Sequence, residues 1–363
     1  MIRNYPQKSH VRRIFKDYVT GDQGKAFLKR KGILAFCLRK ESLADIGANH
    51  YFDRESYVNL KKTMDVDNNY RKASRVSFDK KNVNKFQEII ENINNTIIDE
   101  TDNTKVRVTR ENGKTKIMLK YESIQPSKID LLDYTQKELE ITLNEGETKC
   151  SLDYNIESPA DGRKVQQLLD YVNKDEKKPL TFEMLSLEKL KATGKIELFD
   201  NLFQHIPKPW SLEEIRKLKV KRNSKEEKLK NDQLEGINSA ALDGKNLIEN
   251  PFVKGTIKQG FYFSMVCMRL EHEENSSFID LTVEFKTKPE STEIKIESSG
   301  YYKQEGNEIQ EIKKVLSYTE QDSIIFEFGN ILQDLFDKIL EKKDENSVNL
   351  EVLTQTATTV SDE

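Results

Sequence analysis

The chain has 363 residues, of which 33% are charged and 36% hydrophobic, with three cysteines. This length fits two or three domains of ordinary size, each large enough to bury a core. The longest apolar runs, near residues 32–38 and 260–268, are far shorter than the roughly 20 residues that cross a bilayer, which argues against a membrane protein. Residues 1–15 lack the apolar region typical of a signal peptide, so we expect a cytoplasmic location.

Charge is distributed unevenly along the chain. Residues 1–85 contain 20 Lys and Arg against 9 Asp and Glu, a net charge of +11, whereas the remaining residues have a net charge of −14. A basic segment attached to an acidic body is typical of proteins that bind nucleic acid or another anionic surface. The same asymmetry also fits a basic module that docks on the acidic body, within one chain or between subunits.

The first hundred residues are predicted to form a basic, all-helical module. Apolar residues recur at helical spacing in short stretches around residues 12–18, 40–46 and 53–64. A longer helix is expected over residues 81–98, which carry an apolar stripe. The aromatic side chains of this module are expected in its core: Tyr18, Phe27, Phe36, Tyr51, Phe52 and Tyr57.

From residue 101 the apolar period changes from 3.6 to 2. Apolar residues alternate over 106–108 and 117–119, on either side of Asn112-Gly113, the dipeptide that most favours a tight hairpin turn. A second hairpin is expected over residues 139–156. We therefore predict an α+β hairpin subdomain over residues 101–175, completed by a helix that begins near residue 161.

Residues 181–343 are predicted to form a second α+β body. Helical spacing indicates a helix over 196–206, and alternation indicates a hairpin over 261–288 followed by a strand at 293–297. A broad apolar face predicts a last helix over 322–342.

Two further segments of this body have their own signals. Ser211 and Glu214 form the Ser-x-x-Glu pattern that is typical of a helix start, so a short helix is expected there. The basic run at residues 216–230 is interpreted as a solvated helix or linker. The polar tail, residues 344–363, is predicted to be disordered.

Few chemical motifs are present. The sequence has no glycine-rich phosphate loop and no zinc-binding or catalytic signature, and the cysteines are too far apart for a disulfide framework. One pattern deserves weight as a possible active site. In residues 278–286, a period of 2 places Asp280, Glu284 and Lys286 on one face of a strand.

A Glu-x-Lys at the end of a strand, with an acid on a neighbouring strand, resembles the metal-binding core of the PD-(D/E)xK nucleases. The resemblance implies that two carboxylates bind Mg²⁺ and that the lysine lies near the attacking water. Glu271, on the preceding strand, is the candidate for the second acid. An ordinary polar face on a half-exposed strand explains the same alternation, and we favour that interpretation.

The basic N-terminal module is the stronger candidate for function. Phosphate binding needs Lys and Arg on a common surface, and such contacts release counterions whatever the base sequence. The residues expected to contribute are Arg12, Arg13, Lys16, Lys29, Arg30, Lys31, Arg39, Lys40, Lys61 and Lys62. No signature selects a particular DNA-binding motif, so base-specific contacts are not predicted.

These patterns predict an α+β protein with a basic all-helical N-terminal module and an acidic body of antiparallel hairpins with packed helices. We expect a nucleic-acid-binding accessory or regulatory protein, with DNA favoured, of a kind that fits prokaryotic defence or mobile-element biology. Two alternatives are a Mg²⁺-dependent nuclease and a non-catalytic oligomeric protein whose basic module docks on an acidic body. We expect no cofactor outside the nuclease alternative, no membrane contact, and a homo-oligomer or a protein partner.

Overall fold

The computed structural model describes most of the chain in several stretches. These are residues 7–36, 39–50, 52–53, 55–56, 59–60, 70–111, 114–124, 134–174, 177–222, 237–244, 247, 250–258, 260–287, 290–305 and 308–358. The chain divides into two compact units. The first comprises Met1–Asn69, Asn95–Arg107 and Met118–Leu139, and the second, the sheet unit, comprises Tyr70–Asn94, Val108–Ile117 and Glu140–Glu363.

The first unit begins with a helical bundle, by which we mean the described residues between 7 and 60. It contains α1 (Lys8–Arg13), the π-helix η1 (Ile14–Tyr18), α2 (Gly21–Arg30) and α3 (Lys40–Ala48). A capping box starts α2, because the Thr20 hydroxyl accepts from the Gln23 backbone N–H at 3.2 Å while the Gln23 side chain accepts from the Thr20 N–H at 3.0 Å.

The apolar faces of these helices meet in a small core. Phe15 and Leu28 are fully buried there, with Leu43 and Leu60 beside them. A Cβ atom at Gly47 would lie 2.9 Å from the Phe15 ring, so glycine is required where α3 crosses that ring. The bundle therefore has a core of its own.

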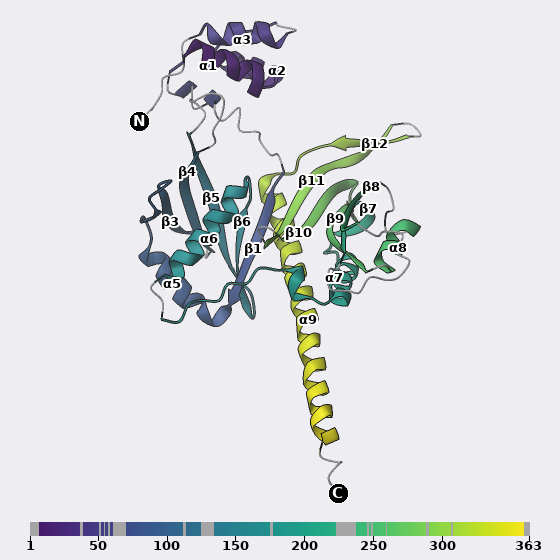
Figure 1. The fold of residues 1–363 in the computed structure, drawn as a ribbon. Helices are drawn as coiled ribbons and strands as arrows, with labels where there is room; N and C mark the ends of the chain where they lie inside the picture. The colour runs from purple at the N-terminus through teal and green to yellow at the C-terminus, as the bar shows by residue number, and fades with distance from the viewer. Residues whose placement is uncertain are drawn as a thin grey trace. The chain divides into compact units, whose positions relative to one another are not determined.

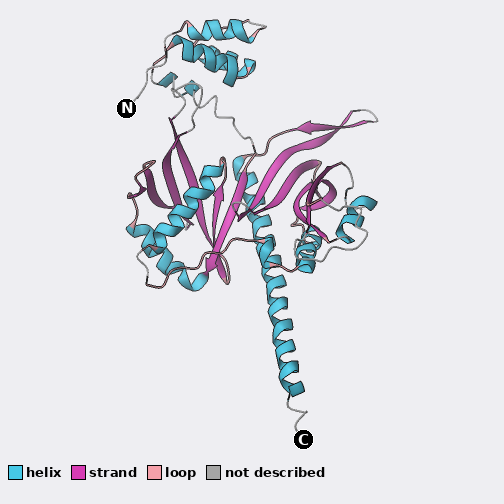
Figure 2. Ribbon diagram, in the orientation of Figure 1, coloured by secondary structure: helices cyan, strands magenta, loops and turns pink. Residues whose placement is uncertain are grey.

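The strands, magenta in Figure 2, pair into one antiparallel sheet. Their order is β2-β3-β4-β5-β6-β1-β11-β10-β9-β7-β8, and β12 pairs with β11. The strands in chain order are β1 (Lys72–Asp79), β2 (Ile97–Asp99), β3 (Thr104–Glu111), β4 (Lys114–Ile124), β5 (Tyr134–Glu145), β6 (Lys149–Asn155), β7 (Trp210–Arg222), β8 (Ser239–Asp243), β9 (Phe261–His272), β10 (Ser277–Thr287), β11 (Glu290–Glu305) and β12 (Glu308–Lys313).

Helices cover the sheet. In chain order they are η2 (Lys80–Asn82), α5 (Val83–Asn92), α6 (Pro159–Asn173), η4 (Leu187–Lys189), α7 (Ala192–Gln204), α8 (Pro251–Lys258) and α9 (Tyr318–Thr358). Strand β1 joins the two halves of the sheet, because it pairs with β6 over seven residues and with β11 over three.

The largest core lies where α7 and α9 pack on strands β7, β9, β10 and β11 (Figure 1). Alternate residues of β10, including Ile279, Leu281 and Val283, are almost fully buried in it, as is Phe328 of α9. Phe199 of α7 makes edge-to-face contacts with rings from β9 and β10. Burial of this many large apolar side chains is the main stabilising term for the second half of the sheet.

The first half of the sheet has a separate layer of helices. Phe78 of β1 lies 5.1 Å, between ring centroids, from Phe86 of α5, and both rings contact Phe182. Residues spaced three and four apart on α6 are buried, as the sequence predicted: Val165, Leu168, Leu169 and Val172. A capping box between Ser158 and Asp161 starts this helix.

The α+β fold class is confirmed, since the described chain combines packed helices with a large antiparallel sheet. The three predicted hairpins are also confirmed as β3-β4, β5-β6 and β9-β10. Residues 112–113, the predicted turn of the first hairpin, lie outside the described residues.

Three predictions of secondary structure were wrong. The first hundred residues are not all helical, because β1 occupies Lys72–Asp79 and β2 occupies Ile97–Asp99. The Ser211–Glu214 segment belongs to strand β7 rather than to a helix, because β9 offers a partner for its backbone along the whole length. Residues 216–222 of the basic run, interpreted as a solvated helix or linker, also belong to β7, where Leu218 and Val220 are fully buried. Helix α9 continues to Thr358, beyond its expected end at residue 342, and disorder of the tail stays a prediction.

In the described part of the chain, none of the helices combines the length and the apolar character needed to span a bilayer. Helix α9 is 41 residues long, but it is amphipathic in its first half. The cytoplasmic location stays a prediction.

Candidate functional site

The predicted phosphate-binding residues of the helical bundle divide into paired and unpaired groups. Arg12 pairs with Asp45 at 2.5 Å, Arg13 with Asp17 at 3.5 Å, and Lys31 with Asp53 at 3.8 Å. The other basic side chains described in this bundle have no ionic partner among the described residues: Lys8, Lys16, Lys25, Lys29, Arg30, Arg39 and Lys40. All of them are exposed or half-exposed.

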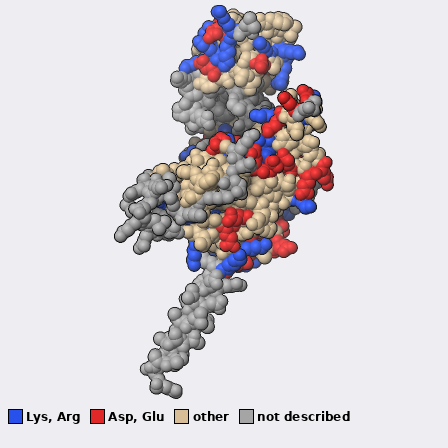
Figure 3. All heavy atoms as spheres, turned by 90° about the vertical axis from the view of Figure 1, so that its right-hand side faces the viewer, with Lys and Arg blue, Asp and Glu red and all other residues tan. Residues whose placement is uncertain are grey.

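Four of these unpaired residues are close together in sequence on either side of one loop. Lys29 and Arg30 lie in the last turn of α2, where positive charge also interacts favourably with the helix dipole. Arg39 directly precedes α3, and Lys40 is its first residue. On the face drawn in Figure 3, Lys and Arg side chains gather on the bundle, whereas several clusters of acidic side chains cover the sheet unit.

Some basic residues of the N-terminal segment belong to the sheet unit rather than to the bundle. Six of the 20 basic residues counted in residues 1–85 belong to the sheet unit: Arg71, Lys72, Arg75, Lys80, Lys81 and Lys85. Four of these six have carboxylate partners there. Residues 1–69 alone have 14 basic and 8 acidic residues, so the excess of positive charge in the bundle is smaller than the sequence count suggests. Lys61 and Lys62 lie outside the described residues.

The prediction that the aromatic residues of the bundle are core residues is correct only in part. Phe27 and Phe52 are buried and stack with their ring centroids 5.8 Å apart. In contrast, Phe36 is 93% exposed and Tyr18 is 41% exposed. Tyr51 and Tyr57 lie outside the described residues.

The residues of the nuclease-like pattern are all described, but each faces a neighbouring polar group. Asp280 is held by Arg269, whose Nε and Nη2 atoms donate to its two carboxylate oxygens at 2.6 and 3.0 Å. Glu284 pairs with Lys219 at 3.4 Å, and Lys286 pairs with Glu293 at 2.7 Å.

Glu271, the candidate second acid, lies on β9 opposite Phe278 of β10 and interacts with the hydroxyl of Tyr302. Among the residues that the structure describes, no group of three or more His, Cys, Asp and Glu side chains is arranged to hold a metal ion. The nuclease alternative stays a prediction without geometric support.

Arg269 is the centre of a buried ion network. Its side chain is 1% exposed, and besides Asp280 it donates to Glu311 and to the Tyr302 hydroxyl, both at 3.1 Å. Its guanidinium carbon lies 3.9 Å from the centroid of the Phe278 ring. Burial alone would raise the pKa of Asp280, but hydrogen bonds from Arg269 and Ser298 outweigh it and lower the pKa. This network joins β9, β10, β11 and β12, and its role is structural.

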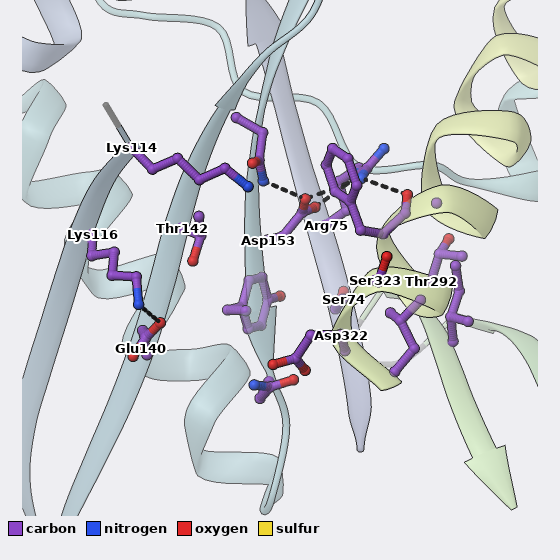
Figure 4. A pocket seen from close by; sticks show the side chains of 18 of the residues that line it. Ser74, Arg75, Lys114, Lys116, Glu140, Thr142, Asp153, Thr292, Asp322 and Ser323 are labelled. Atoms are coloured by element: carbon purple, nitrogen blue, oxygen red, sulfur yellow. Dashed lines mark hydrogen bonds and ion pairs between the residues drawn. The ribbon is translucent and has the colours of Figure 1, made fainter. Parts of the chain in front are cut away.

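A pocket of about 590 Å³ lies in the sheet unit, between helix α9 and strands β4, β5, β6, β1 and β11 (Figure 4). Alternation along the strands supplies its polar wall, because side chains such as Thr142, Asn144 and Asp153 point to this face while their neighbours point to the helices on the other. Ile325, Phe326 and Leu332 of α9 supply apolar wall. Volumes of this size are typical of sites for small molecules.

One wall of the pocket is held rigidly by Arg75. Its Nε and Nη2 atoms donate to Asp153 at 2.5 and 3.0 Å, and its Nη1 atom donates to the Asn330 side chain at 2.8 Å. Asp153 also accepts from Asn144 at 2.8 Å. A Cβ atom at Gly329 would lie 3.0 Å from the Arg75 guanidinium, so glycine allows α9 to pack directly on this group.

The remaining charges of the pocket nearly cancel. Lys116 pairs with Glu140 at 3.0 Å and lies 3.8 Å from Glu111. Burial raises the pKa of Asp322, and Arg71, 3.6 Å away, opposes that shift. Lys114 has no ionic partner among the described residues, and its amine lies 5.8 Å from the centroid of the Phe326 ring. Because the positive and negative charges of the pocket nearly cancel, the pocket suits a small ligand that donates and accepts hydrogen bonds better than it suits a polyanion.

Sequence reasoning missed the pocket because its residues come from six strands, a loop and a helix. Arg75 and Asp153 are 78 residues apart, and Gly329 is far from both. Local alternation predicted several of these strands, including β5 and β6, but it did not show that their polar faces meet at α9.

Comparison with known proteins found no matching family model, no matching curated protein and no matching solved structure.

Proposed function

We propose that the protein binds nucleic acid through the helical bundle, with DNA as the first partner to test, and that the sheet unit provides assembly or partner contacts. In this proposal the protein acts as an accessory or regulatory factor in nucleic-acid processing. Such a factor fits prokaryotic defence or mobile-element biology.

The observation that carries the proposal is the set of unpaired cations on the bundle. Lys29, Arg30, Arg39 and Lys40 are exposed and have no carboxylate partner among the described residues. A cation already paired with a carboxylate loses that interaction when it binds phosphate, whereas an unpaired one does not. These four residues are therefore the ones whose contacts with phosphate would cost least.

The test is binding of the full-length protein to labelled duplex DNA at several salt concentrations between about 50 and 200 mM. We compare the natural protein with the variant K29Q/R30Q/R39Q/K40Q. If all four side chains contact phosphates, the slope of log K against log salt becomes shallower by as much as about 3.6, since each phosphate contact contributes about 0.9. The affinity at low salt falls with it.

A matched control removes four positive charges from the sheet unit. Lys81, Lys208, Lys303 and Lys342 are each more than half exposed and paired with an exposed carboxylate. Surface pairs of this kind contribute about 0–1 kcal/mol, so K81Q/K208Q/K303Q/K342Q should fold and keep the natural salt dependence. Equal losses in the two variants would show that only net charge matters and would contradict the proposal.

The same samples separate the rival functions. Gel analysis of the DNA after incubation with Mg²⁺ detects cleavage, which would favour the nuclease alternative. Light scattering measures the oligomeric state. If the natural protein does not bind DNA and the bundle variant changes the oligomeric state, the basic bundle serves a protein contact instead.

A further inference from the structure

The loop between α2 and α3 presents two large apolar side chains to solvent. Leu34 is 67% exposed and Phe36 is 93% exposed, whereas Phe15, Phe27 and Leu28 of the same bundle are at most 4% exposed. Phenylalanine is among the residues most often buried in folded proteins. A nearly fully exposed phenylalanine therefore needs an explanation.

The loop holds these side chains in place. Residues 33–36 have neither helix nor strand structure, and their exposure alternates along the chain. Ile33 and Ala35 pack against the core of the bundle, so Leu34 and Phe36 face away from it. Gly32, with a φ of +80°, turns the chain out of α2 just before this segment. The exposure of Phe36 thus follows from the anchoring of its neighbours.

The unpaired cations of the bundle flank this apolar pair. Lys29 and Arg30 precede the loop and Arg39 and Lys40 follow it, and all four are exposed. An exposed aromatic ring among cations matches the chemistry of an unpaired nucleotide, whose base stacks on a ring while its phosphate contacts a cation. The bases of a duplex are already stacked on one another and cannot offer a face to Phe36.

We infer that the bundle binds single-stranded nucleic acid in preference to duplex, with Phe36 stacking on a base and Leu34 contacting its edge. This inference rests on the proposed function and names its ligand more closely. An anionic membrane would also attract cations and apolar groups. It is less favoured, because interfacial helices bury a long apolar face in the lipid, whereas the helices of this bundle bury theirs in its core.

The test compares binding of the full-length protein to a labelled single strand of about 20 nucleotides and to the duplex of the same sequence. We expect tighter binding to the single strand. Phe36→Ala should weaken that binding about fivefold or more, with an unchanged salt dependence, because a stacking contact is lost and no phosphate contact is. Phe36→Tyr should keep the natural affinity.

The matched control is Phe252→Ala, which removes an exposed phenylalanine from α8 of the sheet unit; Phe252 is 48% exposed. This variant should bind the single strand and the duplex with the same affinities as the natural protein. Because Phe36 has almost no buried area, Phe36→Ala should retain its natural circular dichroism and melting temperature, so a loss of binding cannot be ascribed to unfolding.

Three outcomes would overturn the inference. Binding to duplex that is as tight as to single strand, with no effect of Phe36→Ala, overturns the single-strand inference and leaves the proposed function intact. Binding to neither probe overturns both. A Phe36-dependent association with vesicles of phosphatidylserine and phosphatidylcholine, without Phe36-dependent binding to nucleic acid, assigns the surface to membranes instead.

Discussion

Asp280→Ala distinguishes the two interpretations of the acidic strand β10. If Asp280 belongs to a metal-dependent active site, the variant folds normally and loses a reaction. If Asp280 is the partner of Arg269, the variant leaves a guanidinium that is 1% exposed without its main carboxylate. The geometry predicts the second result.

The size of the effect follows from the environment of Arg269. Removing one partner of a buried ion pair typically costs about 3–5 kcal/mol, because the other charge stays buried without compensation. Glu311 and Tyr302 still accept hydrogen bonds from Arg269 in the variant, at 3.1 Å. We therefore expect the lower end of that range, a loss of about 3 kcal/mol in the free energy of unfolding.

Urea unfolding measures this loss, with fluorescence of the single tryptophan as the signal. Trp210 is 8% exposed and lies on β7, which pairs with the strand that carries Arg269. For a denaturant slope of about 3 kcal/mol per M, the midpoint should fall by about 1 M. The double variant Arg269→Met/Asp280→Leu should recover much of the loss, because it removes both charges and leaves Arg216 paired with Glu311 at 3.3 Å.

The control is Glu284→Gln on the same strand face. Glu284 and Lys219 are 27% and 38% exposed, so breaking their pair should cost no more than about 1 kcal/mol. An Asp280→Ala variant with the natural urea midpoint would refute the structural reasoning, and loss of Mg²⁺-dependent DNA cleavage in that same variant would place Asp280 in an active site.

Two further variants probe the pocket. Gly329→Ala should destabilise the protein by about 1 kcal/mol, because the clash of the new Cβ with the Arg75 guanidinium, 3.0 Å away and fixed by Asp153, outweighs the gain of about 1 kcal/mol in helix propensity. Gly255→Ala on α8, where nothing lies within 4 Å of the new Cβ, should instead stabilise the protein by up to about 1 kcal/mol. If thermal melts show the same change in melting temperature for both variants, the role given to Arg75 is contradicted. Burial raises the pKa of the Asp322 carboxyl in the folded state, so the folded protein binds this proton more tightly than the unfolded protein does. The protonated Asp322 therefore stabilises the folded state fully below the unfolded pKa of about 4, and this stabilisation is lost as the pH rises through the folded pKa. Asp322→Asn should therefore raise the melting temperature at neutral pH and lose this advantage in acid, and a lower melting temperature at neutral pH would show that the Asp322–Arg71 pair dominates.

Local patterns predicted the elements whose stability comes from near neighbours in sequence. The hairpins were recognisable because each strand alternates and its partner follows directly, as with β5 and β6. Two of the strands that were missed, β1 and β7, have partners that lie far along the chain. β7 carries strict alternation of Lys217, Lys219 and Lys221 with Leu218 and Val220, but the capping pattern before it favoured a helix. In β1, charged residues interrupt a short apolar alternation, and its partners β6 and β11 lie far along the chain.

The candidate sites also differ in whether their residues are close together in the sequence. The basic residues near the loop of the bundle are close together in sequence, so composition alone located them. Sequence could not tell that Phe36 is exposed while Phe27 is buried, because that depends on which side of the loop packs on the helices. Nor could it tell that Asp280 is neutralised by Arg269, since the pairing is set by the register of β9 against β10.

Ion pairing, rather than net charge, separates the cations that can bind a partner from those that stabilise the fold. Arg75 and Arg269 each donate two hydrogen bonds to one carboxylate, at 2.5–3.0 Å, and both lie in the sheet unit. A phosphate that approached Arg75 would have to displace Asp153 and leave it buried without its partner. Among the described residues, no carboxylate pairs with Lys29 or Lys40, so a phosphate that approached either would break no ion pair there. Removing the charge of these two lysines should therefore affect binding while leaving folding intact.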